Sequence, residues 1–208
     1  RQPLYAPDRE QVLAVNGEIY NHQELRAQYG SAYQFQTGSD CEPILALYRD
    51  LYADGHEPTD QDICRMLERL SGIFAFVLYD HQRDRFLIAR DPIGVIPLYI
   101  GYDDAGRIYV GSELKALEGQ CDHYEPFLPG HYYWSPTGSM KRYYRRDWMV
   151  YANVAHNGAS ASAVRDSLQS AVRRQLMSDV PYGVLLSGGL DSSIISAVAA
   201  RYSERRVE

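Results

Sequence analysis

Short apolar runs of strand length, separated by turns rich in Asp and Gly, constrain the fold of this chain more than any other feature. The runs are "GIFAFVLYD", "RFLIARD", "LYIGYDD" and "RIYVGSE". The segments "DHQRD" and "DDAG" between them have the composition of hairpin connections. Strands joined by such short turns pair in antiparallel fashion. The middle of the chain is therefore predicted to form antiparallel sheet.

Segments upstream of these runs add another strand and helices. The segment "QVLAVNGEIYN" predicts a strand through residues 12–15 that runs into a polar turn, and "HQELRAQYG" predicts a short helix ended by Gly30. The segment "CEPILALYRDLYADG" carries a helical apolar face that stops at Gly55. Many antiparallel strands with a few helices favour a layered α+β domain.

Composition narrows the class of protein. A chain of 208 residues with 45% hydrophobic residues is long and apolar enough for one or two packed domains. The net charge of −6 argues against nucleic-acid binding, and no apolar run approaches the roughly 18 residues of a membrane span. The 3 cysteines lie in no CxxC pair, which indicates neither a disulfide framework nor a zinc site. We therefore expect a cytoplasmic protein with no nucleic-acid or membrane partner.

The pattern changes near residues 147–160. The loop-like segment "WMVYANVAHNGASAS" precedes a helix with Ser162 as its predicted N-cap. Apolar residues of this helix recur at every fourth position: Val164, Leu168, Val172 and Leu176. The continuous apolar run "VPYGVLL" then predicts a strand buried on both faces. Helix, buried strand, turn and helix open an α/β nucleotide-binding domain, so we predict one domain over residues 1–155 and a second over residues 156–208.

The segment "LLSGGLDSS" has the residue types of a phosphate-binding loop. Gly188 and Gly189 can adopt positive φ and let backbone N–H groups approach an anion. A helix that starts near Asp191 directs its partial positive end to the same place, and Asp191 itself is expected either to cap that helix or to engage Mg²⁺ on a polyphosphate. No Lys follows the glycines, so the loop is not a Walker A motif. An ordinary Ser/Gly turn is the alternative.

The polar turn "NGEIYNH" is a second candidate site. An Asn amide and a Gly backbone N–H have the chemistry of an oxyanion hole. Glu18, together with a second acid, is able to hold an ammonium group, and Asp40 in "TGSDCE" is the candidate partner. The alternative is that Asn16 and Gly17 form only a hairpin turn.

Ordered segments of the chain resemble the glutamine-hydrolysing asparagine synthetase family. They are "LAVNGEIYNH", "TGSDCE", "LSGIFAFVLYD", "ARDPIGVIPLY", "GSELKAL", "LPGHYYW" and "LLSGGLDSS". The resemblance implies a glutaminase domain, a four-layer αββα sandwich of the N-terminal-nucleophile hydrolase kind that is incomplete at its N-terminus here. It also implies the start of a Rossmann-like α/β ATP pyrophosphatase domain. Such enzymes release ammonia from glutamine and use MgATP to convert aspartate to β-aspartyl-AMP, from which ammonia displaces AMP.

The resemblance implies roles for individual residues. Asn16 and Gly17 resemble the oxyanion hole, and Glu18 and Asp40 resemble the pair that binds the α-amino group of glutamine. The residues that resemble the ATP and pyrophosphate loop are Leu186, Ser187, Gly188, Gly189, Leu190, Asp191, Ser192 and Ser193, with Asp191 as the candidate contact to Mg²⁺. Arg90 and Asp91 of the core signature are predicted to form a structural ion pair. The family also suggests a homodimer.

The chain departs from the family pattern at its start. The family's nucleophile is an N-terminal cysteine, whereas this chain begins with Arg1, and the family's arginine for the glutamine carboxylate also lies upstream. Cys41 has neither an N-terminal amine nor a neighbouring His, so we do not expect it to replace that nucleophile. We predict an internal fragment that is inactive alone. Two alternatives remain: a sister synthetase, such as a β-lactam-forming enzyme, and a non-catalytic glutamine- or nucleotide-binding module.

Overall fold

The computed structural model describes residues 2–178 and 182–203, and the chain divides into two compact units. The first unit spans residues 1–146 and the second residues 147–208. The division falls at the start of the stretch in which the sequence changes character. The domain boundary predicted near residue 155 remains a prediction.

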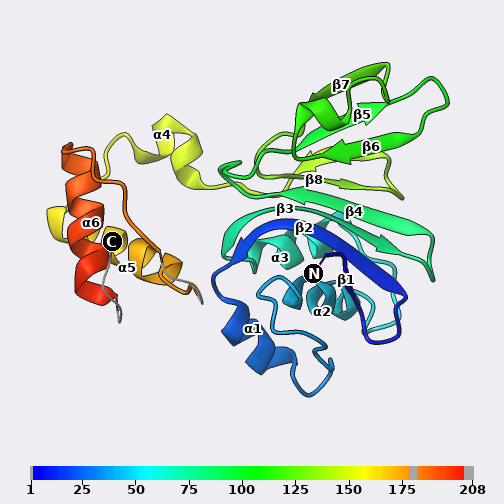
Figure 1. Cartoon of the computed structure of the whole chain (residues 1–208), viewed down its shortest axis with the longest axis horizontal. Coiled ribbons are helices and arrows are strands. Elements are labelled where there is room, and N and C mark those ends of the chain that lie inside the picture. Colours follow the sequence, from blue (N-terminus) through cyan, green and yellow to red (C-terminus); the bar gives the residue numbers. More distant parts are fainter. Residues whose placement is uncertain (1, 179–181, 204–208) are drawn as a thin grey trace. The chain divides into compact units, whose positions relative to one another are not determined.

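Two antiparallel sheets form the framework of the first unit (Figure 1). The larger sheet has the strand order β1-β2-β3-β4-β8-β9 and the smaller has the order β6-β5-β7. The strands are β1 (Leu4–Tyr5), β2 (Gln11–Ile19), β3 (Gly72–Asp80), β4 (Arg85–Arg90), β5 (Tyr99–Tyr102), β6 (Ile108–Gly111), β7 (His123–Pro126), β8 (His131–Trp134) and β9 (Ser139–Arg142). The apolar runs that predicted antiparallel sheet are β3 to β6, which confirms that prediction.

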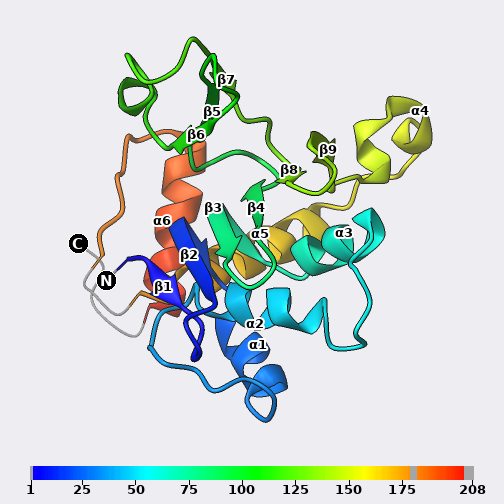
Figure 2. The same cartoon turned by 90° about the vertical axis from the view of Figure 1, so that its right-hand side faces the viewer.

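Three helices cover one face of the larger sheet (Figures 1 and 2). They are α1 (His22–Tyr29), α2 (Pro43–Asp50) and α3 (Asp60–Glu68). Helices were predicted at α1 and α2, although α2 ends before Gly55. Helix α3 was not predicted. It begins with a capping box in which the Thr59 side chain accepts from the backbone N–H of Asp62 and the Asp62 carboxylate accepts from the backbone N–H of Thr59.

Strand β3 separates two apolar cores because its side chains alternate between the faces of the sheet. Phe74 and Phe76 pack against the helices. Ala75 belongs to the core between the two sheets, together with Leu98 and Phe127. The unit is thus layered as helices, larger sheet and smaller sheet, which are consecutive layers of the predicted α+β sandwich.

The second unit is helical in its described residues. It contains a 3₁₀ turn (Asp147–Met149), α4 (Tyr151–Val154), α5 (Ala161–Gln175) and α6 (Leu190–Tyr202). Helix α5 confirms the predicted periodic segment, but Ser162 is not its N-cap. Ser160 has the extended backbone of an N-cap and its hydroxyl accepts from the Ala163 N–H at 3.3 Å, so Ser162 already lies inside the helix. None of the described helices is long and apolar enough to cross a bilayer.

The strand predicted from "VPYGVLL" is not formed by its described part. Val180 and Pro181 lie outside the described residues, and residues 182–186 have no strand conformation. Leu185 is 95% exposed. A strand buried in a parallel sheet needs neighbouring strands for its backbone hydrogen bonds, and the described residues of the second unit contain no other strand.

Candidate functional site

Strand β2 directs Asn16 and Glu18 toward the smaller sheet. Leu13 and Ile19 on the same strand are fully buried in the core beneath the helices. Because successive side chains point to opposite faces of a strand, residues 14, 16 and 18 share the other face. Asn16 and Glu18 are both exposed there, and the main chain of Asn16 pairs with that of Ala75 in β3.

A cleft of about 240 Å³ opens between the sheets beside Asn16. Most of its lining is apolar, from Ala14, Ala75, Val77, Leu98 and Val110. Ser112 follows β6 in the smaller sheet, and its Oγ accepts from Asn16 Nδ2 at 3.4 Å. The amide of Asn16 therefore lies at a polar edge of an otherwise apolar cleft, where it can donate to a ligand carbonyl.

Gly17 occupies a position in β2 where the neighbouring strand β3 leaves no room for a side chain. Its φ is +138°, a conformation that other residues rarely adopt. A Cβ atom at this position would lie 2.1 Å from the carbonyl oxygen of Ile73 and 2.7 Å from Cα of Phe74. Only glycine fits this backbone, so the strand that carries Asn16 and Glu18 depends on it.

Asp40 lies at the end of β2 that carries Glu18. One carboxylate oxygen of Asp40 accepts from the Ile19 N–H at 2.8 Å. The structure thus places the Asp40 carboxylate on the backbone N–H that follows Glu18, so the two acids that the sequence predicted as a pair lie at the same end of β2, although they are far apart along the chain. Neither has an ion-pair partner among the described residues. The pair can therefore attract a cation such as a primary ammonium group.

The thiol of Cys41 lies close enough to Asp40 and Glu18 for both carboxylates to affect its pKa. The thiol is 3.6 Å from Asp40 Oδ2 and 3.6 Å from the Gly17 carbonyl oxygen, and the residue is buried. Burial raises the pKa of Cys41, and the negative charges of Asp40 and Glu18 raise that pKa further. A thiol held protonated in this way is a poor nucleophile, which supports the expectation that Cys41 is not the reactive cysteine.

Arg90 and Asp91 hold the loop after β4 through its backbone and form no ion pair with each other in the described structure. The Arg90 guanidinium donates to the carbonyl oxygens of Ile96 and Gly94 at 2.7 and 2.8 Å. The buried carboxylate of Asp91 accepts from several N–H groups of the same loop, including that of Gly94 at 2.6 Å. The predicted ion pair is therefore wrong, because each side chain satisfies main-chain groups that the bent loop leaves unpaired; the predicted structural role of both residues agrees with these contacts.

The predicted phosphate loop surrounds the N-terminus of α6 in the second unit. Helix α6 begins at Leu190, and Gly189 occupies the N-cap position without a side-chain cap. Asp191 lies in the first turn and does not cap the helix, which corrects one of its two predicted roles. Gly188 has φ +82°, and an added Cβ there would meet nothing within 4 Å. The side chains of Leu186 and Leu190 are exposed and apolar, so these two residues have only backbone groups to offer a phosphate.

The hydroxyl groups of this loop bind one another and the start of the helix. Ser187 Oγ lies 2.9 Å from Ser192 Oγ, and Ser193 Oγ donates to the Gly189 carbonyl oxygen at 2.7 Å. The N–H groups of a first helical turn, serine hydroxyls and a glycine with positive φ suit an anionic oxygen ligand. The structure therefore places the predicted loop residues together around the N-terminus of α6.

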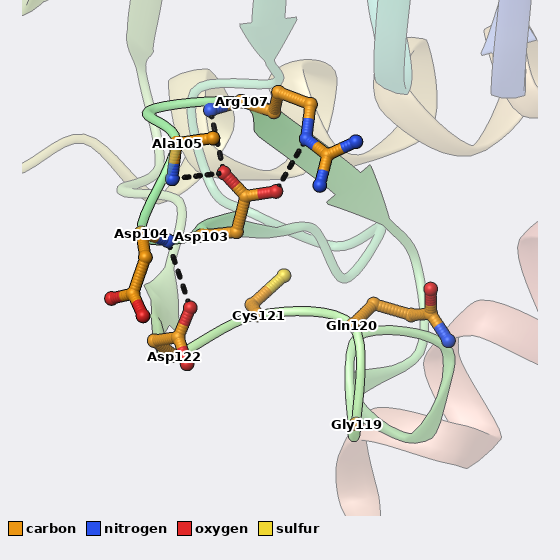
Figure 3. Close-up of a pocket in the computed structure, with 8 residues that line it drawn as sticks. All are labelled: Asp103, Asp104, Ala105, Arg107, Gly119, Gln120, Cys121 and Asp122. Atoms are coloured by element: carbon orange, nitrogen blue, oxygen red, sulfur yellow. Dashed lines mark hydrogen bonds and ion pairs between the residues drawn. The ribbon is translucent and has the colours of Figure 1, made fainter.

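A separate hollow of about 440 Å³ lies at the turn between β5 and β6 (Figure 3). Its carboxylates bind the turn itself. Asp103 accepts from the backbone N–H groups of Ala105 and Arg107 at 3.0 and 2.9 Å, and Asp122 accepts from the Asp104 N–H at 2.9 Å. These local contacts account for the acidic residues, and none of the predicted site residues lines this hollow.

Sequence reasoning assigned no role to Glu42 and Arg26, which organise the turn that carries Asp40. Glu42 is fully buried and accepts from the backbone N–H groups of Gln36 and Thr37. The only local signal was an acid close to Asp40 in "TGSDCE". A single charged residue does not reveal its own burial, so this role became visible only in three dimensions.

Comparison with known families agrees with this geometry. The family model described as "Glutamine amidotransferase domain" matches residues 1–119, and the model described as "Asparagine synthase" matches residues 163–208. The chain is 55% identical over 207 residues to asparagine synthetase B [glutamine-hydrolyzing] of Escherichia coli (strain K12), covering 100% of this chain and 35% of that protein. It is 45% identical to the probable asparagine synthetase of Dictyostelium discoideum, covering 100% of this chain and 36% of that protein.

Solved structures resemble the chain more distantly. Glutamine phosphoribosylpyrophosphate amidotransferase from B. subtilis, complexed with ADP and GMP, is 23% identical with a TM-score of 0.56, over 100% of this chain and 48% of that one. This likeness shows the fold alone, and it agrees with the α+β sandwich. The chain spans about a third of the length of the curated relatives named above. Because a model matches more than half of its residues, the chain belongs to the glutamine amidotransferase domain family.

Proposed function

We propose that the chain is part of a glutamine-dependent asparagine synthetase. In this proposal residues 1–155 belong to the domain that hydrolyses glutamine to glutamate and ammonia, and residues 156–208 begin the part that binds ATP. The full-length protein uses the ammonia to amidate aspartate through β-aspartyl-AMP, with ATP cleaved to AMP and pyrophosphate. The observation that carries the proposal is the position of the Asp40 carboxylate on the Ile19 N–H, at the same end of β2 as Glu18 and on the strand whose Asn16 lines the cleft.

The geometry supports a division of labour in glutamine hydrolysis. Glu18 and Asp40 bind the α-ammonium group of glutamine through charge-assisted hydrogen bonds. The Asn16 amide and the Gly17 N–H then donate to the oxyanion that forms when the N-terminal cysteine of the full-length protein attacks the side-chain carbonyl. Each such donor contributes about 10²–10³ in rate in enzymes of known mechanism. The apolar lining of the cleft strengthens these interactions by excluding water.

The loop at residues 186–193 fits the phosphates of MgATP. The first turn of α6 supplies N–H groups, and the Ser187, Ser192 and Ser193 hydroxyls can turn outward from their present partners. Asp191 is the single carboxylate of the loop, and Mg²⁺ is commonly held by one or two carboxylates and substrate phosphates rather than by a protein cage. When bound, Mg²⁺ would neutralise charge on the departing pyrophosphate.

The proposal is tested with the full-length protein, given glutamine and MgATP with and without aspartate. We expect pyrophosphate and asparagine to appear together, only when aspartate is present, and glutamate to be released from glutamine. Pyrophosphate release that does not respond to aspartate would contradict the assignment. A sister synthetase with another acceptor would then replace it, and the homodimer suggested by the family would need its own measurement by light scattering.

A further inference from the structure

We propose that Glu42 and Arg26 are positioning residues that fix the turn at residues 36–40 and thereby set the affinity of the site for glutamine. The inference rests on the proposed function, because it assumes that Asp40 binds the α-ammonium group. Neither Glu42 nor Arg26 contacts the cleft beside Asn16. They act through the backbone of the turn.

The carboxylate of Glu42 binds the backbone N–H groups at the start of the turn. Its side chain has no exposed surface. One oxygen accepts from the Gln36 N–H at 2.6 Å, and the other accepts from the Thr37 N–H at 2.8 Å and from the Thr37 hydroxyl at 2.7 Å. An acceptor buried this deeply is retained only where several donors compensate the loss of hydration, and apart from Arg26 these donors belong to the turn.

Arg26 holds the carbonyl side of the same turn. Its Nη2 donates to the carbonyl oxygens of Thr37 and Ser39 at 2.9 and 2.6 Å and lies 3.4 Å from Glu42 Oε2. The guanidinium carbon also lies 4.4 Å from the centre of the Phe35 ring. The planar fork of an arginine suits such multiple acceptors, whereas lysine presents a single flexible charge. Backbone donors and acceptors of the turn are therefore both bound by one ion pair, whose carboxylate is fully buried and whose guanidinium is partly buried.

This arrangement fixes Asp40. The turn ends one residue after Ser39, so the position of Asp40 follows from the carbonyl that Arg26 binds. At the other side, the Asp40 carboxylate accepts from the Ile19 N–H at 2.8 Å, next to Glu18. A shift of about 1 Å in a ligand-binding group is enough to weaken an enzyme site strongly. Loosening the turn should thus separate the two carboxylates and weaken ammonium binding without altering Asn16 or Gly17.

The primary variant is Glu42→Gln in the full-length protein, because it keeps the volume of the side chain and removes one acceptor and the charge. We expect the KM for glutamine to rise about tenfold or more, with kcat for glutamine hydrolysis changed by less than about threefold. The rate of asparagine synthesis from added ammonia should stay unchanged, because that reaction requires neither glutamine binding nor glutamine hydrolysis.

Two variants of Thr37 test the same turn in case Glu42→Gln does not fold. Thr37 is exposed, so its substitution should disturb folding less than a change at the buried Glu42. Thr37→Val is nearly isosteric and removes the hydroxyl that donates to Glu42 and accepts from the Ser39 N–H at 3.1 Å. Thr37→Ser keeps that hydroxyl. We expect the KM for glutamine to rise clearly in Thr37→Val, by about threefold or more, and to return toward the unmodified value in Thr37→Ser.

Asp80→Asn is the matched control. Asp80 is, like Glu42, a fully buried carboxylate, and it accepts from Tyr48 OH at 3.2 Å and from Arg83 Nη1 at 3.0 Å. It pairs with Gln11, at the end of β2 remote from Glu18. We expect Asp80→Asn to lower the melting temperature, as Glu42→Gln also should, while leaving the KM for glutamine unchanged.

The outcomes separate this inference from the proposed function. A raised KM in Glu42→Gln and Thr37→Val, with Asp80→Asn unaffected, supports the positioning role. Hydrolysis by the unmodified protein with an unchanged KM in both variants, or an equal rise in Asp80→Asn, overturns the positioning role and leaves the proposed function standing. Absence of glutamine hydrolysis by the unmodified protein overturns the proposed function and this inference with it.

Discussion

Gly17 has two roles in this account: it allows β2 to pack against β3, and its N–H is proposed to donate to the oxyanion. Its backbone conformation and the 2.1 Å approach that a Cβ would make to the Ile73 carbonyl oxygen leave no room for a side chain. A close approach of strands also keeps Asn16 and Glu18 in register with β3. The same residue is therefore required by the sheet and proposed as an oxyanion donor.

Gly17→Ala should destabilise the protein by about 2–4 kcal/mol, because the substitution adds backbone strain to a steric clash. Gly38→Ala is the control, since a Cβ at Gly38 would meet nothing within 4 Å. Urea unfolding followed by circular dichroism measures both variants. Equal midpoints for the two would refute the claim that this strand position admits only glycine.

Cys41→Ala should retain glutamine hydrolysis in the full-length protein. The buried thiol has a pKa raised by burial and by the carboxylates of Asp40 and Glu18, so it remains protonated at neutral pH. A steady-state assay of glutamate release is the measurement, with kcat expected within about threefold of the unmodified protein. Complete loss of hydrolysis in a variant that still folds would identify Cys41 as the nucleophile.

Helix α3 is attached to the sheet by one carboxylate at its first turn. Asp60 accepts from Tyr132 OH on β8 at 2.7 Å and from Lys141 Nζ on β9 at 2.6 Å. The hydrogen bond from Lys141, followed by that from Tyr132, lowers the pKa of Asp60 below its ordinary value of 3.8. These contacts connect segments far apart in the chain and favour one docking of the helix.

The lowered pKa of Asp60 predicts a pH dependence of stability. A carboxyl group whose folded pKa is depressed stabilises the fold above its unfolded pKa, and that contribution is lost as pH falls through the folded value. Asp60→Asn should therefore lower the free energy of unfolding at pH 6 by about 1 kcal/mol or less, since the group is largely solvated. The difference should shrink as the pH falls below 3.8 and Asp60 becomes protonated in the folded protein.

Urea unfolding of the two proteins at several pH values checks this, with Glu118→Gln as a control because Glu118 is exposed. A difference between Asp60→Asn and the unmodified protein that does not shrink as the pH falls below 3.8 would contradict the assigned cause.

Local patterns predicted what is local in this fold. Strands β3 to β6 and helices α1 and α2 followed from alternation and apolar spacing, and the polar residues of "NGEIYNH" and "TGSDCE" indicated Asn16 and Asp40 as candidates. The polar turn predicted after residue 15 is wrong, because β2 continues through Asn16 and Glu18 to Ile19 and pairs there with β3. Ser162 was predicted as the N-cap of α5, but Ser160 occupies that position, with an extended backbone and a hydroxyl that accepts from the Ala163 N–H. Helix α3 was overlooked although Thr59 and Asp62 form a capping box.

Features that depend on distant partners could not be predicted in this way. The strand expected around Leu185 requires neighbours in a sheet that the described residues of its unit do not supply. The roles of Glu42 and Arg26 depend on burial beneath the turn at residues 36–40. Likewise, Arg90 and Asp91 are adjacent in sequence, yet each binds backbone groups of a bent loop rather than the other.

The chain as a whole consists of two compact units with separate proposed chemistries. Glutamine is proposed to bind in the first unit and the phosphates of ATP at the start of α6 in the second. Asp191→Asn in the full-length protein should therefore reduce pyrophosphate release by about tenfold or more, because a contact to Mg²⁺ is lost. Glutamine hydrolysis should continue.

Asp166→Asn on α5 serves as the control for that variant, since Asp166 is exposed and contacts only its neighbour Arg165 among the described hydrogen bonds. We expect it to leave pyrophosphate release unchanged. Equal activity of Asp191→Asn and Asp166→Asn would exclude Asp191 from the ATP site.

The measurement that tests the account most directly is the KM for glutamine of Glu18→Gln in the full-length protein, beside its synthesis of asparagine from added ammonia. Loss of one charged hydrogen-bond partner costs about 1.5–3 kcal/mol, which corresponds to a rise in KM of about 10–100-fold. We predict that rise, with the ammonia-dependent reaction unchanged. An unchanged KM for glutamine would show that the carboxylates at the end of β2 do not bind the substrate, and would contradict the proposed site.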